Sequence, residues 1–141
     1  MDLDLVIARL KATLTGLKSI GTSVDLDAAI DGVVAVPAAF VLPLADSATP
    51  IDMAGSTDER ETGAFGVVHV VSNRRDAQGA AALNDLKTLR LNLRAALVGW
   101  VPDAATGEPV HRTTGRLLRM DGNGRLWWID EFQLITYYRS T

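Results

Sequence analysis

The sequence predicts an α+β domain built on a mainly antiparallel or mixed β-sheet of about four strands, with two main helices packed on it. Three observations support this class. Two segments carry apolar residues at helical spacing, two pairs of segments have the composition of β-hairpins, and the 141 residues suffice for one hydrophobic core. The predicted order is helix, short helix, hairpin, long helix, hairpin. We expect residues 1–141 to form a single domain.

The first helix is predicted from apolar residues that recur every three or four positions. These residues are Leu3, Val6, Ile7, Leu10, Leu14 and Leu17. Gly16 and Gly21 place the end of the helix near one of them. Residues 25–30 (DLDAAI) then predict a short second helix with Asp25 as its N-cap.

The first hairpin begins after Pro37 with the apolar run AAFVLPLA, which Asp46 closes. Pro43 has no backbone N–H to donate, so we expect an edge strand or a strand that ends there. Residues 64–72 predict the second strand, antiparallel to the first. The intervening residues 47–62 have no apolar period, and we expect a long flexible loop that is mobile in the free protein and ordered against a partner.

The second main helix is predicted over residues 77–98, and Gly99 and Pro102 end it. Its buried stripe consists of Leu83, Leu86, Leu89, Leu93, Ala96, Leu97 and Trp100. The last hairpin pairs residues 115–120 with residues 125–138. The turn between them, Asp-Gly-Asn-Gly, is a strong hairpin signal.

Composition excludes several classes of function. The chain has no cysteine, which rules out disulfides, thiolate metal sites and a cysteine nucleophile. A net charge of −3 without a long basic run disfavours non-specific nucleic-acid binding. The acidic, interrupted start differs from a secretory signal, and no segment reaches the roughly 20 apolar residues of a membrane span. These features indicate a soluble protein with a real core.

The final strand is apolar on both of its faces. With strand periodicity, Trp128, Phe132 and Tyr138 point one way, and Trp127, Ile129 and Tyr137 point the other way. Each face of such a strand requires a cover, because aromatic side chains gain much from burial. We expect that copies of this chain cover one another, which favours an assembly component over an enzyme.

Neither histidine has a motif around it that would indicate a metal site or a nucleophile–base pair. His69 lies within an apolar strand and is expected to be packed or hydrogen-bonded there. Asp130 and Glu131 are the most plausible acid–base pair, but adjacent strand residues point to opposite faces. We expect instead that they mark the point at which the strand is no longer covered by other elements, or that they pair with arginines of a neighbour. The Asp-x-Asn-x-Arg sequence at 121–125 lacks the later ligands of a calcium loop and is interpreted as a turn.

Two arrangements of the main helices are open. They cover opposite faces of the sheet in a monomer, or they share one face and leave the other to a neighbouring subunit. Lys87, Arg90 and Arg94 line one side of the long helix, either as a solvated face or as a contact for an acidic partner.

Three stretches, at 36–46, 63–103 and 115–139, resemble the tail terminator proteins of tailed bacteriophages, of the Mu-like type. The similar features are a Pro-Ala-Ala-hydrophobic strand, an Asn-x-Arg-Asp turn into an alanine-rich helix ending Gly-Trp-x-Pro, and a Trp-Trp-x-Asp-x-Phe strand ending Tyr-Tyr. Each feature consists of turn and packing residues, so the specificity of the match comes from their joint order and spacing.

The resemblance implies a structural, non-enzymatic virion protein. Such a protein forms a homohexameric ring that caps the tail tube, stops its polymerisation and provides the surface for head–tail joining. Implied partners are the protein itself, the tail tube protein and a head-completion or neck protein, with the sheath protein as a further candidate. DNA passes through the lumen without specific binding, and no membrane, metal or cofactor is involved. The implied location is the tail–neck junction of the virion, after assembly in the host cytoplasm.

The predicted interface residues rest on this sequence rather than on the family. They belong to a charged cluster in the 47–62 loop, to a basic turn and to the outward face of the last strand. They are Asp58, Glu59, Arg60, Glu61, Arg74, Arg75, Trp127, Ile129 and Tyr137. Two alternatives to the terminator function are another neck or head-completion protein and a small acid–base hydrolase that uses Asp130 or Glu131.

Overall fold

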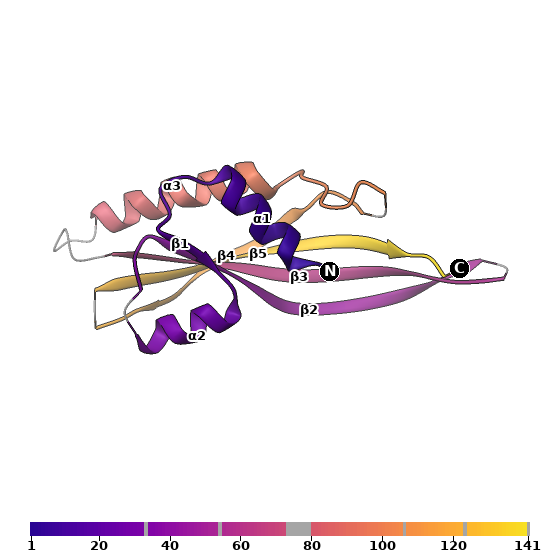
Figure 1. Ribbon diagram of the computed structural model, residues 1–141, viewed down its shortest axis with the longest axis horizontal. Helices are drawn as coiled ribbons and strands as arrows, with labels where there is room; N and C mark the ends of the chain where they lie inside the picture. The colour runs from indigo at the N-terminus through magenta and orange to yellow at the C-terminus, as the bar shows by residue number, and fades with distance from the viewer. Residues whose placement is uncertain (33, 54, 73–79, 106, 123, 141) are drawn as a thin grey trace.

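A computed structural model describes residues 1–32, 34–53, 55–72, 80–105, 107–122 and 124–140 (Figure 1). The described elements are α1 (Leu3–Thr13), β1 (Ser19–Gly21), α2 (Ser23–Asp31), β2 (Ala38–Met53), β3 (Ser56–Ser72), α3 (Ala80–Leu97), β4 (His111–Met120) and β5 (Arg125–Tyr138). The strands form one sheet in the order β1-β2-β3-β5-β4. The β1–β2 pair is parallel and the other pairs are antiparallel. The predicted α+β class, both hairpins and the short second helix are confirmed, whereas the strand β1 was not predicted.

The segment predicted as a loop at 47–62 is instead most of a long hairpin. β2 continues to Met53 and β3 starts at Ser56, and the two strands pair from Asp46–Gly63 to Met53–Ser56. The loop prediction is therefore wrong in secondary structure, whereas the predicted mobility of the segment stays a prediction. Sequence periodicity missed these strands because residues 43–50 of β2 are exposed on both faces, so neither face needs to be apolar there.

Proline placement in β2 agrees with an edge position. β1 pairs only with residues 38–40 of β2, so the outer edge of β2 beyond this point has no neighbour among the described strands. Pro43 and Pro50 both lie in that part of β2, where a missing N–H costs no ladder hydrogen bond. The register shifts between Pro43 and Ala45, as expected for a bulge near an edge.

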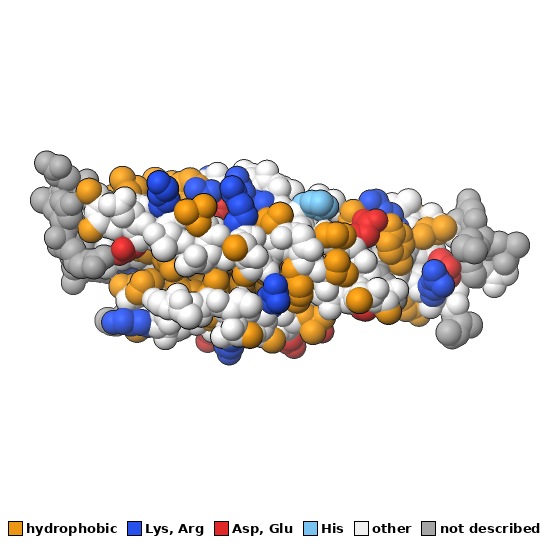
Figure 2. All heavy atoms as spheres, turned by 90° about the horizontal axis from the view of Figure 1, so that it is seen from above, with side chains coloured by type: hydrophobic (Ala, Val, Ile, Leu, Met, Phe, Trp, Pro, Cys, Tyr) orange, Lys and Arg blue, Asp and Glu red, His pale blue; other side chains and the backbone are white. Residues whose placement is uncertain are grey.

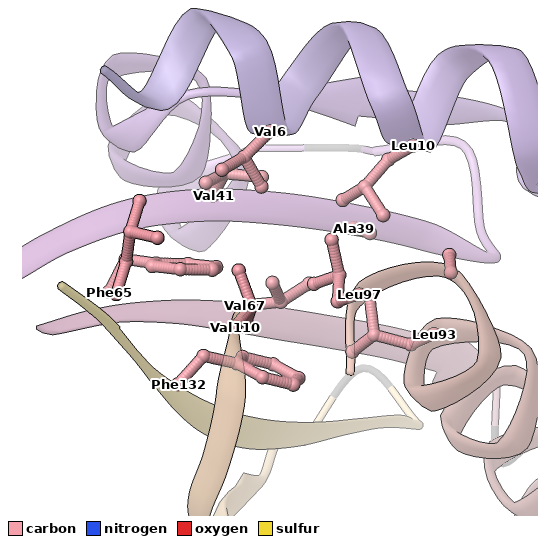
Figure 3. Close-up of a cluster of buried hydrophobic side chains, with 12 residues drawn as sticks. Val6, Leu10, Ala39, Val41, Phe65, Val67, Leu93, Leu97, Val110 and Phe132 are labelled. Atoms are coloured by element: carbon pink, nitrogen blue, oxygen red, sulfur yellow. The ribbon is translucent and has the colours of Figure 1, made fainter. Parts of the chain in front are cut away.

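Helices α1 and α3 pack on the same face of the sheet (Figures 1 and 3). Val6 and Leu10 of α1 and Leu93 and Leu97 of α3 bury their side chains against β2, β3 and β5. Below them the rings of Phe65 and Phe132 stack with centroids 5.4 Å apart. The two main helices therefore share one face, as in the second of the two alternatives, whereas the neighbouring subunit on the other face stays a prediction.

The opposite face is covered at one end by the short helix α2. Ala29 of α2 packs with a buried cluster of side chains from β2, β3 and β5. This cluster comprises Ala38, Phe40, Val68, Val70, Trp127 and Ile129. A helix of the same chain, rather than a neighbouring subunit, therefore buries this part of the face.

An arginine fastens α2 to the end of the last hairpin. The Arg125 Nη1 atom donates to the carbonyl oxygens of Ala29 and Gly32 at 3.2 Å each, at the C-terminal end of α2. A cation at this position stabilises the helix, because the unpaired carbonyls there carry partial negative charge. Asp121 Oδ2 accepts from Arg125 Nε at 2.8 Å and from Trp127 Nε1 at 2.9 Å, so the hairpin turn and the helix share one hydrogen-bonded cluster.

The N-cap of α2 differs from the prediction. Thr22 is the cap, and Asp25 lies at the third helical position of a capping box, where its Oδ2 accepts from the Thr22 N–H at 2.7 Å. This hydrogen bond lowers the pKa of the exposed Asp25 carboxyl from its usual value.

The described helices include none that is long and apolar enough to cross a membrane.

Candidate interaction surfaces

A groove of about 400 Å³ lies between α3 and the β4–β5 edge of the sheet. We call it the α3–β4 groove. Its rim carries Leu83, Lys87, Leu91, Arg94 and Arg112, and its floor is formed by Trp128, Asp130 and Phe132, with Arg90 between them. On this face of the molecule basic side chains gather along α3 (Figure 2). The groove therefore combines exposed apolar side chains with several cations.

Asp130, at the floor of the groove, is buried and held by two arginines. The Nε and Nη2 atoms of Arg90 donate to its two carboxylate oxygens at 3.0 Å each. Arg112 Nη1 adds a longer contact of 3.4 Å, and His69 Nε2 lies 3.6 Å from Asp130 Oδ2. Arg90 also lies over the Trp128 ring, 4.4 Å from its centroid, so a cation–π contact orients the same guanidinium.

The ionised form of Asp130 is strongly favoured. Burial acts to raise the pKa of the carboxyl, but His69 and the Arg90 guanidinium act in the opposite direction and hold this pKa well below its usual range. A carboxylate that stays charged and bonded to two arginines is a poor general acid or base. The expected pairing of this acid with arginines is present, but the arginines come from α3 and β4 of the same chain.

The structure separates the two candidate acids of a hydrolase. Asp130 pairs with Val67 on the face that carries α1 and α3, whereas Glu131 pairs with Gly66 and points to the opposite face. Their carboxylates therefore cannot act on one substrate atom. His69 is fully buried beside Asp130, which agrees with its predicted role as a packed residue of the sheet. Within the described residues no cluster of His, Cys, Asp or Glu side chains could hold a metal ion.

The charged residues predicted for the loop lie on the β2–β3 hairpin, and the register divides them between two faces. We call residues 44–62 of this hairpin the arm. Glu59 and Glu61 point to the same side as α1, together with Asp46 of the paired strand, whereas Asp58 and Arg60 point to the other side. Glu61 accepts from the N-terminal ammonium group of Met1 at 2.7 Å, and Asp58 accepts from Ser140 N at 3.2 Å.

The prediction that Trp127 and Ile129 point outward is wrong. Trp127 and Ile129 are only 2% and 3% exposed, because α2 and its neighbours cover them. Tyr137 is half-buried, and its hydroxyl donates to Glu108 Oε1 at 3.0 Å. Tyr138, on the opposite face, remains 63% exposed. Arg74 and Arg75 lie outside the described residues.

Sequence reasoning found the basic stripe of α3 but not the groove beside it. The sequence predicted the strand β4 only from residue 115, whereas β4 begins at His111 and therefore brings Arg112 to the edge of the sheet together with Arg116 and Arg119. Residues 111–120 contain three arginines and no acid, and this excess of positive charge was the signal in the sequence that could have indicated a basic surface there. What the sequence did not supply is the register that places Arg112 beside Arg90.

Comparison with known families agrees with the resemblance noted above. The model of the family described as phage tail terminator protein matches residues 1–140. This match does not distinguish the Mu-like type from others, so the subtype stays a prediction. Comparison with individual curated proteins found no match.

Proposed function

We propose, from the premise that this chain belongs to the phage tail terminator family, that it caps the tail tube as a ring of identical subunits. Members of the family are structural virion proteins, so the chain is a component of a bacteriophage tail. In our proposal six copies form the ring, stop polymerisation of the tube and provide the surface on which the head is joined. The partners are then the tail tube protein, a neck or head-completion protein and the protein itself, with the sheath protein as a further candidate.

The observation that carries this proposal is the arm. The arm extends past α1 and α2, and residues 43–50 of β2 are all exposed although they lie in a regular strand (Figure 1). β5 flanks β3 only as far as the Glu59–Tyr138 pair, so the outer part of the arm is a two-stranded hairpin. Such a hairpin gains little stability in water, because it buries little apolar surface. A long hairpin that projects from a core is therefore well suited to an interface, where a second protein supplies the missing contacts.

A closed ring requires a heterologous interface, in which one patch meets a different patch on the next copy. The chain offers unlike patches: the arm, with its free outer β2 edge, and the exposed edge strand β4 beside the α3–β4 groove. Each chain has a net charge of −3, which favours passage of DNA through a ring over tight binding to phosphates.

The test is tube capping by the purified protein. Added to tail tube protein of the same phage during polymerisation, it is expected to stop growth and to leave a ring at one tube end in electron micrographs. The control is an equal amount of an unrelated acidic protein, which leaves tube length unchanged. Tubes that grow to the same length with and without this chain contradict the proposed function.

The arm is expected to gain order on assembly. Its exposed backbone predicts fast amide hydrogen exchange in the free protein, and contact with a neighbour predicts protection. Hydrogen–deuterium exchange followed by mass spectrometry checks this on peptides from residues 44–62, with peptides from the buried centre of β3 as an internal reference. Equal exchange of the arm in free and tube-bound protein runs against a role of the arm in the interface.

The two alternatives lack a comparable observation. The hydrolase alternative would use Asp130 or Glu131, but the Asp130 carboxylate is buried and bonded to Arg90 and Arg112, and Glu131 faces the opposite side of the sheet. A different neck protein would serve at the same junction, but the family match over residues 1–140 favours a terminator.

A further inference from the structure

Charge in this chain is divided between two ends of the molecule. Residues 46–61, in the arm, include five acids and one base, whereas α3 and β4 together include six arginines or lysines and one acid. The arm projects from one end of the sheet, and α3, which borders the groove, lies toward the other end (Figure 1). The two regions therefore cannot meet within one chain.

The acids of the arm are ordered by the strand register. Asp46 pairs with Gly63, and Glu59 and Glu61 alternate with Arg60 along β3, so Asp46, Glu59 and Glu61 lie on one face. We call this the acidic face of the arm. Glu61 is held by the amine of Met1, whereas Asp46 is exposed and Glu59 is half-exposed.

The groove has the properties of a site for an acidic protein segment. Arg90 and Arg112 are engaged by Asp130, but Lys87 and Arg94 lie exposed on the rim. Leu83 and Leu91, which alternate with these two cations along α3, are 57% and 55% exposed. A nucleic-acid backbone would neutralise the cations but would leave the leucines uncovered, whereas a protein segment can contact both.

From these observations we propose that the acidic face of the arm of one subunit docks against the α3–β4 groove of the next subunit. This inference rests on the proposed function, because it names the two patches that make the ring interface. The patches differ, so the contact is heterologous and repeats head to tail around the ring. Attraction between them speeds association and selects the register of the contact.

Charge reversal on each patch tests the inference. The arm variant is Asp46→Lys with Glu59→Lys, and the groove variant is Lys87→Glu with Arg94→Glu. These four residues avoid the Asp130 network and the Met1–Glu61 pair, so both variants are expected to fold. The control variant, Lys18→Glu with Asp27→Lys, reverses two exposed charges outside both patches.

Each reversed variant alone is expected to associate with itself about 100-fold more weakly than the wild type, because like charges then meet at every contact. An equimolar mixture of the arm and groove variants restores attraction at every contact, in a ring that alternates the two. The mixture is therefore expected to associate and to cap tubes as the wild type does. Sedimentation velocity measures association in solution, and tube length measures capping for rings that close only on the tube.

Several outcomes overturn this inference but leave the proposed function standing. These are variants that associate and cap like the wild type, a mixture that regains neither activity, and a control variant that loses as much as the others. A groove variant that loses only binding to short duplex DNA assigns the groove to nucleic acid and also overturns it. A wild-type chain that neither associates nor caps tubes contradicts the proposed function itself.

Discussion

Replacing Trp127 by alanine is expected to lower the free energy of unfolding by about 4 kcal/mol, in the range of buried large-to-small substitutions. The indole is 2% exposed and fills the space between α2 and the sheet. Its Nε1 atom also donates to Asp121 Oδ2 at 2.9 Å, so the substitution removes a donor from the cluster that fastens the turn to α2. Urea denaturation followed by circular dichroism measures the loss.

Tyr138 provides the matched control. It lies on the same strand but is 63% exposed, so Tyr138→Ala is expected to change the free energy of unfolding by less than about 0.5 kcal/mol. The pair of variants separates a core residue from a surface aromatic. A Trp127→Ala protein as stable as the wild type, but impaired in association, would show that this indole serves an interface and would contradict its burial beneath α2.

Asp130→Asn is expected to cost about 3 kcal/mol, toward the lower end of the range for breaking a buried ion pair from one side. The substitution leaves the guanidinium groups of Arg90 and Arg112 without their carboxylate. Both arginine side chains are 29% exposed, so water offsets part of the cost. Glu131→Gln, on the opposite face of the same strand, is the control and should change stability by less than about 0.5 kcal/mol.

The same carboxylate predicts how stability depends on pH. Because the pKa of Asp130 is lower in the folded protein than in the unfolded chain, its contribution is complete above about pH 5. This contribution to stability is lost as the pH falls below about 4, toward the pKa of Asp130 in the folded protein. In this range the Asp130 carboxylate of the unfolded chain binds a proton more readily than that of the folded protein. Thermal unfolding from pH 7 to pH 2 should therefore show the wild type and Asp130→Asn converging in stability. A constant difference across this range would contradict the depressed pKa.

The parts of the fold that were predictable are those in which one face packs on the core. The apolar stripe of α3 was visible in the sequence, and Leu86, Leu89, Leu93, Ala96 and Leu97 of that stripe are buried. The last hairpin was equally clear, because its turn residues are specific. The arm was missed for the opposite reason, since residues 43–50 of β2 are exposed on both faces and have no apolar pattern to detect.

The candidate site shows a second limit of sequence reasoning. Asp130 was named as a candidate acid, but its partner Arg90 lies forty positions earlier, and Arg112 lies on a strand whose start was not predicted. Similarly, the short helix was expected, but nothing local indicated that α2 would cover Trp127. Both relations depend on which elements become neighbours in the sheet, and that is decided by the whole chain.

The position of β3 between β2 and β5 sets the sequence in which the protein can be completed during synthesis. β3 pairs with β5 through residues more than fifty positions apart, whereas its pairing with β2 needs only a tight turn. A nascent chain that has just left the ribosome as far as α3 therefore holds β3 with one bare edge, which invites pairing with other chains. This edge of β3 is covered only when β5 has been translated, so the time between synthesis of β3 and of β5 determines how long each new molecule exposes it.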